Sequence, residues 1–350
     1  MARIEPGGNF RNKESYEEPP AQESGYGECS TACQMPLQPY EVPDWLVFLD
    51  DYEVESLLIT GSFGGVYAAR RQIDDLQIVK AKGASEDLDS KRDSKALTPG
   101  LYFPCEAFEQ TATQSACAVS LKVISKDSVA EWVQIPGEHQ VIPLEIALMK
   151  IIGRPPVSPG IIQLLDWCIS SYNVFLVLER PEPFIELHDF VFKYEKDLEE
   201  PHAWRIFQQI VEALHHCLSR GVFHRDVKMN NILIQVHTCQ IKLMNFEGAS
   251  QLREGEYTTF RGALKYAPPE WFTKKRYEAA PATVWALGVV LYALVFGVFP
   301  FDTCKDTVKG NIAFPKNITR ECRKLILHCL SKCPRERPSL EEILRHAWMI

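Results

Sequence analysis

Four side chains with reactive or metal-binding groups lie within twenty residues of one another. Asp226 carries a carboxylate that can accept a proton, and Lys228 carries an ammonium group that can offset negative charge. Asn231 follows Asp226 by five residues, and Asn245 follows Asn231 by fourteen, so two amide oxygens are available for a hard cation. A base, a fixed positive charge and oxygen ligands for a metal ion suit phosphate chemistry at a hydroxyl. The spacing therefore indicates a candidate site for phosphoryl transfer.

The residues around Asp226 are similar to the catalytic loop of protein kinases, whose pattern is H-R-D-x-x-x-x-N. The resemblance implies that Asp226 accepts the substrate's hydroxyl proton, that Lys228 neutralises the transferring phosphoryl group, and that Asn231 binds magnesium. A chance polar turn between apolar segments is the weaker alternative. Where kinases have an Asp-Phe-Gly aspartate that also holds magnesium, this chain has Asn245. Asn231 and Asn245 are therefore the predicted metal ligands, and Asn245 lacks the full negative charge.

The residue two positions beyond Asn245 offers a carboxylate. Residues i and i+2 share a face of an extended chain, so Glu247 is one candidate to replace the missing aspartate. Its side chain is longer than that of aspartate and its register is shifted. The alternative is that Glu247 points to solvent and Gly248 takes over the turn. Both interpretations stay open from the sequence.

A glycine cluster within residues 52–70 predicts two strands joined by a turn. It resembles the kinase pattern G-x-G-x-x-G-x-V with Ile59 in place of the first glycine. Glycine lets a backbone approach phosphates without a Cβ clash. Gly61 and Gly64, together with Val66, are therefore predicted to bind nucleotide. A plain β-turn explains such a cluster about as often.

Lys122 ends an apolar strand, and Glu145 follows in a segment with a helical pattern and a proline near its start. A lysine at a strand end is usually a solvated side chain. The kinase resemblance instead implies that Lys122 and Glu145 form an ion pair, which presents the ammonium group to the α- and β-phosphates of ATP. Ser120 stands where the family has an alanine that contacts the nucleotide.

A segment that ends in Y-A-P-P-E-W resembles the close of a kinase activation segment. Arg337 is predicted to pair with Glu270 of this motif and to anchor it. Upstream, Thr258 and Thr259 are candidates for phosphorylation and pairing with Arg225. The alternative is that the two threonines are ordinary loop residues.

Three further segments narrow the resemblance: Leu164–Trp167, Leu178–Pro183 and Tyr266–Trp271. In order and spacing they are similar to the Pim family of serine/threonine protein kinases. The likeness covers about residues 52–349, outside a predicted insert. It implies an α+β, bilobal protein-kinase fold with a β-rich N-lobe and a mainly helical C-lobe.

The Pim resemblance also implies the adenine-binding residues. Leu178 would be the gatekeeper, Glu179 would offer its carbonyl to adenine, and Glu186 would lie near the ribose. Pro181 in the hinge has no N–H, so adenine loses one of its two usual hinge hydrogen bonds. Met229-Asn230 stand where Pim kinases have acidic residues that help select basic substrates, so a preference for arginine-rich substrates is in doubt.

The chain divides into parts of different composition. Residues 1–45 are rich in Glu, Pro, Gly, Ser and Gln, which predicts a disordered N-terminal tail. Residues 46–349 form the predicted kinase domain, with an N-lobe at 46–180 and a C-lobe at 181–349. Residues from about 78 to 117 form an insert, interpreted as a functional loop, a disordered segment or a transcript artefact.

Composition argues against two classes of partner. A net charge of -8 and a pI near 5.7 indicate neither a nucleic-acid-binding nor a membrane-binding surface. Eleven cysteines without a disulfide framework favour reduced thiols in the cytoplasm, with the nucleus as a second location. The apolar run Val284–Phe301 imitates a membrane span, and we interpret it as a buried core helix. The Pim resemblance suggests a monomer.

Two functional interpretations follow. The first is a Pim-like serine/threonine kinase that transfers the γ-phosphoryl group of ATP, with Mg²⁺, to protein substrates at a reduced rate. The second is a pseudokinase that binds nucleotide weakly or not at all and acts as an interaction or scaffold module. Lys122, Glu145 and Asp226 favour the first interpretation, whereas Asn245 and Glu247 favour the second.

Overall fold

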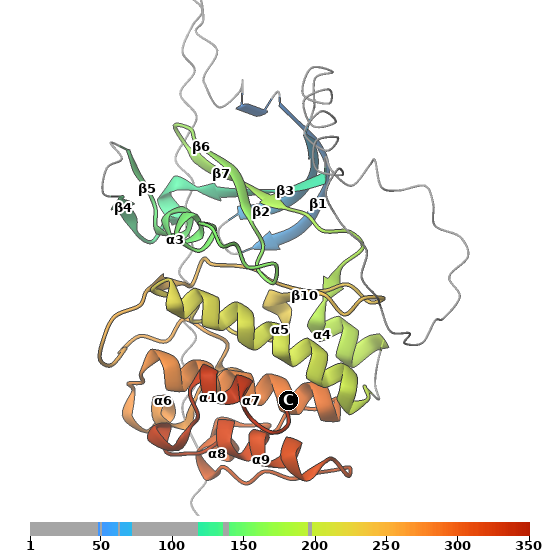
Figure 1. Cartoon of the computed structure of the whole chain (residues 1–350). Coiled ribbons are helices and arrows are strands. Elements are labelled where there is room, and N and C mark those ends of the chain that lie inside the picture. The colour runs from blue at the N-terminus through green and yellow to red at the C-terminus, as the bar shows by residue number, and fades with distance from the viewer. Residues whose placement is uncertain (1–47, 50, 62–63, 72–117, 136–139, 195–197) are drawn as a thin grey trace, which may run out of the picture. The chain divides into compact units, whose positions relative to one another are not determined.

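A computed structural model gives the fold of the chain (Figure 1). It describes the following residues: 48–49, 51–61, 64–71, 118–135, 140–194 and 198–350. The predicted tail at 1–45 and the predicted insert at about 78–117 lie outside these ranges. The tail, the insert and the domain boundaries drawn around them stay predictions.

Strands are concentrated before residue 180, and helices after it. In chain order the strands are β1 (Tyr52–Gly61), β2 (Gly64–Arg71), β3 (Ala118–Ser125), β4 (Trp132–Gln134), β5 (Val141–Pro143), β6 (Leu164–Ile169), β7 (Asn173–Glu179), β8 (Ile185–Glu186), β9 (Val222–Phe223), β10 (Ile232–Ile234), β11 (Ile241–Leu243) and β12 (Ser250–Gln251). The helices are α3 (Leu144–Ile152), α4 (Leu187–Asp189), α5 (Glu200–Ser219), α6 (Pro269–Lys274), α7 (Ala279–Phe296), α8 (Cys304–Lys309), α9 (Arg320–Cys329) and α10 (Leu340–Leu344). Short 3-10 segments are η2 (Lys126–Ser128), η4 (Met229–Asn231), η5 (Leu264–Tyr266) and η6 (Pro334–Glu336), and η3 (Phe190–Tyr194) is π-helical.

The largest sheet brings predicted nucleotide-binding residues from three strands onto one face. Its strand order is β1-β2-β3-β7-β6, and all neighbouring strands are antiparallel. The register pairs Lys122 of β3 with Val66 of β2. It also pairs Ser120 of β3 with Leu178 of β7. Because residues two apart on a strand share a face, these side chains lie together, while the intervening Leu121 is buried on the other face.

The β1–β2 hairpin confirms the prediction of two strands joined by a turn. Gly61 at the end of β1 pairs with Gly64 at the start of β2. A Cβ on Gly64 would lie 1.8 Å from the carbonyl oxygen of Val123, closer than any real Cβ contact. Glycine at this position therefore permits the close approach of β2 to β3.

Helix α3 presents Glu145 to the sheet. Pro143 precedes its first residue, where a missing N–H costs nothing because the first N–H groups of a helix have no partner within it. Ile146, Met149 and Ile152 recur at helical spacing and are buried against the core. Burial of this face fixes the rotation of the helix, and Glu145 stands in its first turn.

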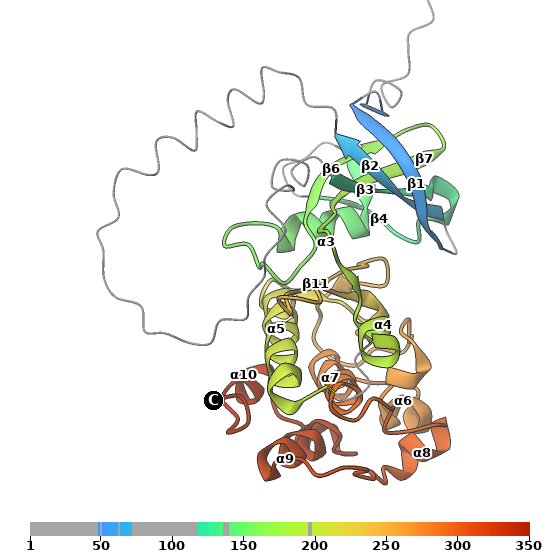
Figure 2. The ribbon, with the colours of Figure 1, turned by 90° about the vertical axis from the view of Figure 1, so that its right-hand side faces the viewer.

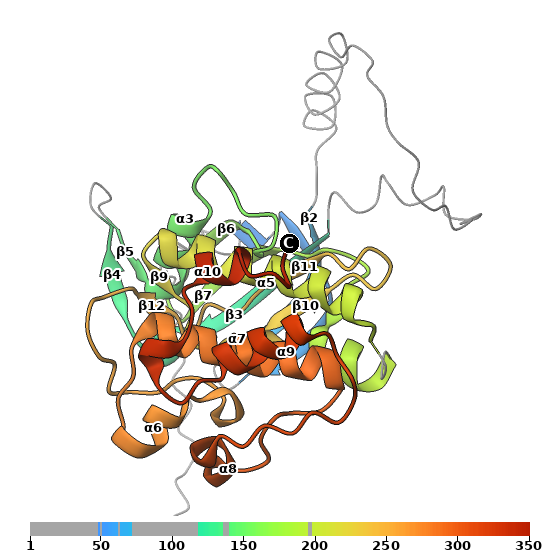
Figure 3. The same cartoon turned by 60° about the horizontal axis from the view of Figure 1, so that its bottom comes forward.

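Helix α7 is hydrophobic on all sides because it lies inside the core. It packs against α5 and α9 (Figures 2 and 3). The helix differs at both ends from the apolar run Val284–Phe301 that was interpreted as a core helix. It begins earlier, at Ala279, and ends earlier, at Phe296. Gly297 follows with φ of +64°, a left-handed conformation that ends helices and favours glycine. Within the described ranges α7 alone is long and apolar enough to cross a membrane, and 89% of it is buried, which confirms the core-helix interpretation.

Candidate active site

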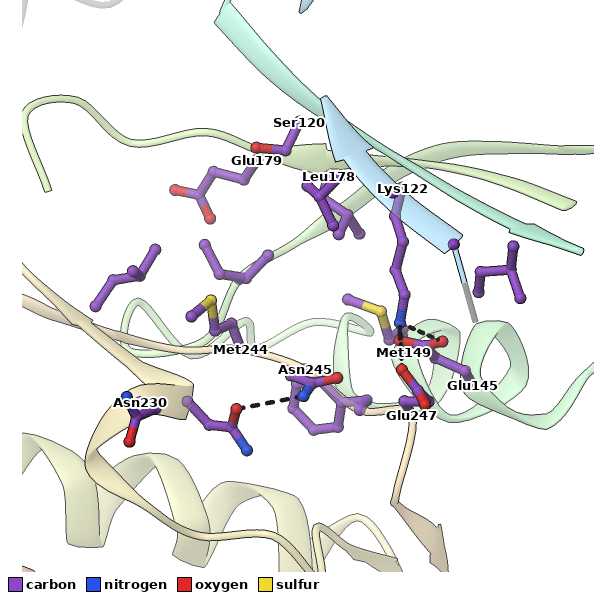
Figure 4. Close-up of a pocket in the computed structure, with 18 of the residues that line it drawn as sticks. Ser120, Lys122, Glu145, Met149, Leu178, Glu179, Asn230, Met244, Asn245 and Glu247 are labelled. Carbon is purple, nitrogen blue, oxygen red and sulfur yellow. Dashed lines mark hydrogen bonds and ion pairs between the residues drawn. The ribbon is translucent and has the colours of Figure 1, made fainter. Parts of the chain in front are cut away.

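A cavity of about 310 Å³ adjoins the sheet face that carries Ser120 and Lys122 (Figure 4). Of the predicted site residues, its wall contains Gly64, Val66, Lys122, Glu145, Leu178, Glu179, Glu186, Lys228, Asn231 and Asn245. A neighbouring cavity of about 440 Å³ contains Asp226 in its wall and shares Glu145 and Asn245 with the first. The fold therefore gathers residues that are more than one hundred positions apart in the sequence around one space.

Lys122 and Glu145 form the predicted ion pair. The Nζ atom of Lys122 lies 2.8 and 2.9 Å from the two carboxylate oxygens of Glu145 (Figure 4). The two side chains are only 13% and 9% exposed, so solvent screens the pair little. Charge-assisted bonds from a strand to a helix thus hold the ammonium group at the cavity wall.

The predicted adenine-binding residues line the same cavity. Leu178 and Glu179 end β7, and Glu186 ends β8. The Glu179 carboxylate is 2.6 Å from Nζ of Lys242, which ties the side chain to β11. The side-chain amide of Asn230 donates to Glu186 at 2.8 Å. Neither contact was predicted from the sequence, because the partners Lys242 and Asn230 are polar residues that belong to no periodic pattern.

Several donors orient the Asp226 carboxylate. Nζ of Lys228 lies 2.7 Å from Oδ2, and Nδ2 of Asn231 donates to the same oxygen at 2.8 Å. The backbone N–H of Ala263 donates to Oδ1 at 3.0 Å. Asn231 also donates to the Asp226 backbone carbonyl at 2.7 Å. The carboxylate is therefore fixed in one orientation, and Oδ1, which accepts only the Ala263 N–H, retains a lone pair for a further proton.

His224 joins the catalytic loop to the segment before Asn245. Its Nδ1 accepts from the Asp226 backbone N–H at 3.3 Å, so Nε2 carries the proton and donates to the Met244 carbonyl at 3.1 Å. The ring is buried and packs edge-on against Phe246, with centroids 4.9 Å apart. Burial lowers the pKa of His224 below its usual value of 6.5. The neutral ring thus holds two parts of the site together.

Asn245 keeps the backbone of the turn but changes its chemistry. Its φ is +65°, a left-handed conformation that asparagine adopts more readily than most residues. Its Nδ2 donates to Oδ1 of Asn231 at 3.2 Å, the dashed line at Asn245 in Figure 4. Two side chains predicted to share a cation are therefore hydrogen-bonded to each other.

The two amides fit a magnesium ion in spacing but not in charge. A half-turn of the Asn245 amide exchanges its nitrogen and oxygen, which brings two oxygens to nearly the same separation. Neighbouring ligands of octahedral magnesium lie about 2.9 Å apart, since Mg–O bonds are about 2.0–2.1 Å. Asn231 and Asn245 can hold the ion as neutral ligands. Elsewhere in the described chain, no group of three acidic, histidine or cysteine side chains could hold a metal ion.

Glu247 approaches Lys122 while it remains exposed to solvent. Its Oε2 lies 3.5 Å from Nζ of Lys122, and its side chain is 42% exposed (Figure 4). The structure therefore supports parts of both interpretations, since Glu247 is exposed and also lies beside Lys122. Glu247 and Gly248 are the central residues of a turn that an Ala249 N–H to Phe246 carbonyl bond of 3.0 Å closes. Metal binding by Glu247 stays a prediction.

The activation segment has the anchor that the sequence predicts. Arg337 donates to the two carboxylate oxygens of Glu270 at 2.8 and 2.6 Å, and both side chains are buried. This bidentate geometry is the strongest form of the pair. Arg225 donates to the backbone carbonyl and hydroxyl of Thr259, the latter at 3.1 Å. Phosphorylation at Thr259 stays a prediction.

Comparison with known proteins identifies this arrangement. Residues 105–349 match the protein kinase domain. The chain belongs to the protein kinase family. It is similar to the serine/threonine-protein kinase pim-2 of Danio rerio, with 38% identity over 288 residues that cover 80% of this chain and 91% of the relative. It is also similar to the serine/threonine-protein kinase prk-2 of Caenorhabditis elegans, with 37% identity over 66% of this chain and 52% of that protein.

Membership of the kinase family implies the use of ATP and a divalent metal ion and action on proteins. The 310 Å³ cavity is lined by Lys122, by apolar side chains and by the amides Asn231 and Asn245, which the sequence predicts to bind the nucleotide and the metal ion. The strand-rich first part and helical second part are the bilobal kinase fold, so the predicted fold class is confirmed.

Proposed function

We propose that this protein is a Pim-like serine/threonine kinase that transfers the γ-phosphoryl group of ATP to protein hydroxyls at a reduced rate. The Lys122–Glu145 ion pair carries the proposal, because it places the ammonium group in the same cavity wall as Lys228 and Asn231. The likeness to pim-2 over 91% of that relative supports both the Pim grouping and the serine/threonine specificity.

The chain's own residues divide the work of the reaction. Lys122 holds the α- and β-phosphates, and the Glu145 carboxylate keeps its ammonium group in position. Asp226, oriented by Lys228 and Asn231, accepts the proton of the attacking hydroxyl. When bound, ATP supplies the phosphoryl group and Mg²⁺ offsets the charge on its phosphates. Leu178, Glu179 and Glu186 form the adenine and ribose contacts of the nucleotide site.

The amide of Asn245 accounts for the reduced rate. Removing one charged stabiliser of the transition state costs about 10²- to 10⁵-fold in rate. Protein kinases turn over at about 1–100 per second, so the expected turnover is slow but above background. The experiment is phosphoryl transfer by purified protein with Mg-ATP and mixed peptide substrates, compared with Asp226→Asn. Equal signals from the two proteins would contradict the proposal.

A pseudokinase is the second candidate. The hydrogen bond between Asn245 and Asn231 favours it, since the metal-side oxygen of Asn231 is already in use. A pseudokinase of this kind gains little or no thermal stability from Mg-ATP, because stabilisation scales with occupancy. A clear rise in melting temperature with Mg-ATP, together with transfer that Asp226→Asn abolishes, would exclude this second candidate.

We further propose a reducing location, the cytoplasm and the nucleus, and a monomeric state. Cys217, Cys322 and Cys329 are buried free thiols. Burial raises the pKa of Cys217 and of Cys329 to about 12, so these thiols stay protonated and inert at neutral pH. Microscopy of the tagged protein tests the location, and light scattering of the purified chain tests the monomer.

A further inference from the structure

Lys122 lies between two carboxylates. The two carboxylate oxygens of Glu145, in α3, lie 2.8 and 2.9 Å from Nζ of Lys122. Glu247, in the segment that follows Asn245, brings Oε2 to within 3.5 Å of the same nitrogen (Figure 4). One positive charge therefore meets two negative charges. A nucleotide phosphate that binds Lys122 has to share that charge with Glu247 or displace it.

The triplet Asn245-Phe246-Glu247 has moved a carboxylate without changing the net charge. An Asp-Phe-Gly triplet and an Asn-Phe-Glu triplet both carry one negative charge. The carboxylate at position 245 would face Asn231, the predicted partner across a metal ion. At position 247 it faces Lys122 instead. The charge has thus moved from the metal side of the cavity to the phosphate side.

We propose that Glu247 competes with nucleotide phosphates for Lys122, so that the site discriminates against adenine nucleotides in proportion to their phosphate charge. The proposal rests on the proposed function only in assigning the 310 Å³ cavity to an adenine nucleotide. It adds a specificity-determining residue, and it predicts that an uncharged adenosine binds independently of Glu247.

Removal of the Glu247 carboxylate is expected to strengthen the binding of nucleotides that carry phosphate. The Glu247 carboxylate is partly shielded from solvent, so the effective dielectric around it is below that of water. The repulsion between this carboxylate and a nearby phosphate is therefore stronger than it would be in water. Each phosphate adds negative charge near it, whereas adenosine adds none. Divalent cations offset the phosphate charge, so they reduce the discrimination. If Glu247 were instead a ligand of the metal ion, its removal would weaken Mg-ATP binding.

The test compares adenosine, ADP and ATP by calorimetry, each in EDTA and in excess Mg²⁺. The proteins are the wild type, Glu247→Gln, Glu247→Asp and the control Glu254→Gln. Glu254 is exposed and lines neither cavity, and its substitution makes the same charge change. Glu247→Asp shortens the side chain by one methylene and moves the carboxylate away from Lys122.

We expect Glu247→Gln to bind ATP about tenfold more tightly than the wild type in EDTA. The gain for ADP is smaller, that for adenosine stays within about twofold, and Glu247→Asp lies between. Equal changes for all three ligands, or a loss of Mg-ATP affinity in Glu247→Gln, would overturn the proposal. Failure of every protein to bind even adenosine would instead contradict the assignment of the cavity to nucleotide.

Discussion

The two sides of the nucleotide cavity differ in how far they retain the charges of a protein kinase. On one side, Lys122 and Glu145 form a close ion pair with little exposure to solvent. On the other side, Asn231 and Asn245 are joined by a hydrogen bond between neutral amides. Asn245 has a left-handed backbone conformation, with φ of +65°. The two sides therefore differ in charge.

The side predicted to anchor the nucleotide and the side predicted to bind the metal ion are altered to different degrees. The first side retains Lys122 and Glu145, the predicted partners of the α- and β-phosphates, with Glu247 added next to Lys122. The side that stabilises charge during transfer has lost a carboxylate. We therefore expect nucleotide affinity and the rate of phosphoryl transfer to respond differently to substitution. Variants of each side test whether the two sides act independently.

The largest effect is expected on the side that is retained. Lys122→Met leaves Glu145 without its partner and removes the cation for the α- and β-phosphates. We expect phosphoryl transfer to fall by about 10³-fold, which is the scale for losing a charged stabiliser. Initial rates with saturating Mg-ATP measure the change. Lys126→Met is the matched control, because Lys126 lies over the Trp132 ring outside both cavities.

If Lys122→Met and the wild type transfer phosphate equally, the ion pair is only structural. A comparable loss in Lys126→Met, which lies in η2 directly after β3, would show that the effect is not specific to the cavity. Melting temperatures of both variants separate these outcomes from unfolding, since a folded protein without activity is the expected state of Lys122→Met.

A smaller effect of opposite sign is expected on the altered side. Asn245→Asp removes the amide donor to Asn231 and restores an anionic ligand for a hard cation. We expect the transfer rate to rise by about 10²-fold, with a sharper dependence on Mg²⁺ concentration. Steady-state rates over a magnesium titration measure both changes. Asn317→Asp, at an exposed position far along the chain, is the control for the added charge.

A rate in Asn245→Asp that equals that of the wild type would mean that the amide does not limit the reaction. In that case the remaining difference from an ordinary kinase lies at Glu247. The double variant Asn245→Asp/Glu247→Gly then shows whether the two positions act together, because residues around one ligand are often non-additive.

The sequence predicted the retained side well and the altered side only in part. An apolar strand ends at Lys122 and a helical pattern after Pro143 contains Glu145, but the kinase resemblance, and not these patterns alone, predicts that the two residues pair. The strand register then brings the pair together. The anchor between Glu270 and Arg337 was likewise predictable, because both residues lie in recognisable motifs.

The direction of Glu247 could not be predicted, because it depends on local backbone geometry. The rule that residues i and i+2 share a face holds for an extended chain, but Asn245 is left-handed and Phe246 is buried in the core. The hydrogen bond of Asn230 to Glu186 was missed for a similar reason. Such contacts form between polar side chains whose positions only the folded chain defines.

The smallest expected effect concerns His224, which joins the catalytic loop to the segment before Asn245. Its Nδ1 accepts from the Asp226 N–H, and its Nε2 donates to the carbonyl that precedes Asn245. Burial lowers its pKa in the folded protein, so below pH 6.5 the unfolded chain binds more protons than the folded one. Stability contributed by the neutral ring is therefore complete above pH 6.5 and is lost as the pH falls below it.

The loss is at most about 1.4 kcal/mol for each pH unit that separates the two protonation equilibria. Urea unfolding of the wild type and of His224→Gln between pH 5 and pH 7.5 measures it, and we expect the wild type to lose more stability over that range. The other histidines titrate in both proteins and cancel in the difference. Parallel curves would mean that His224 is protonated or solvated in the fold, and that a neutral imidazole does not hold the catalytic loop to the segment before Asn245.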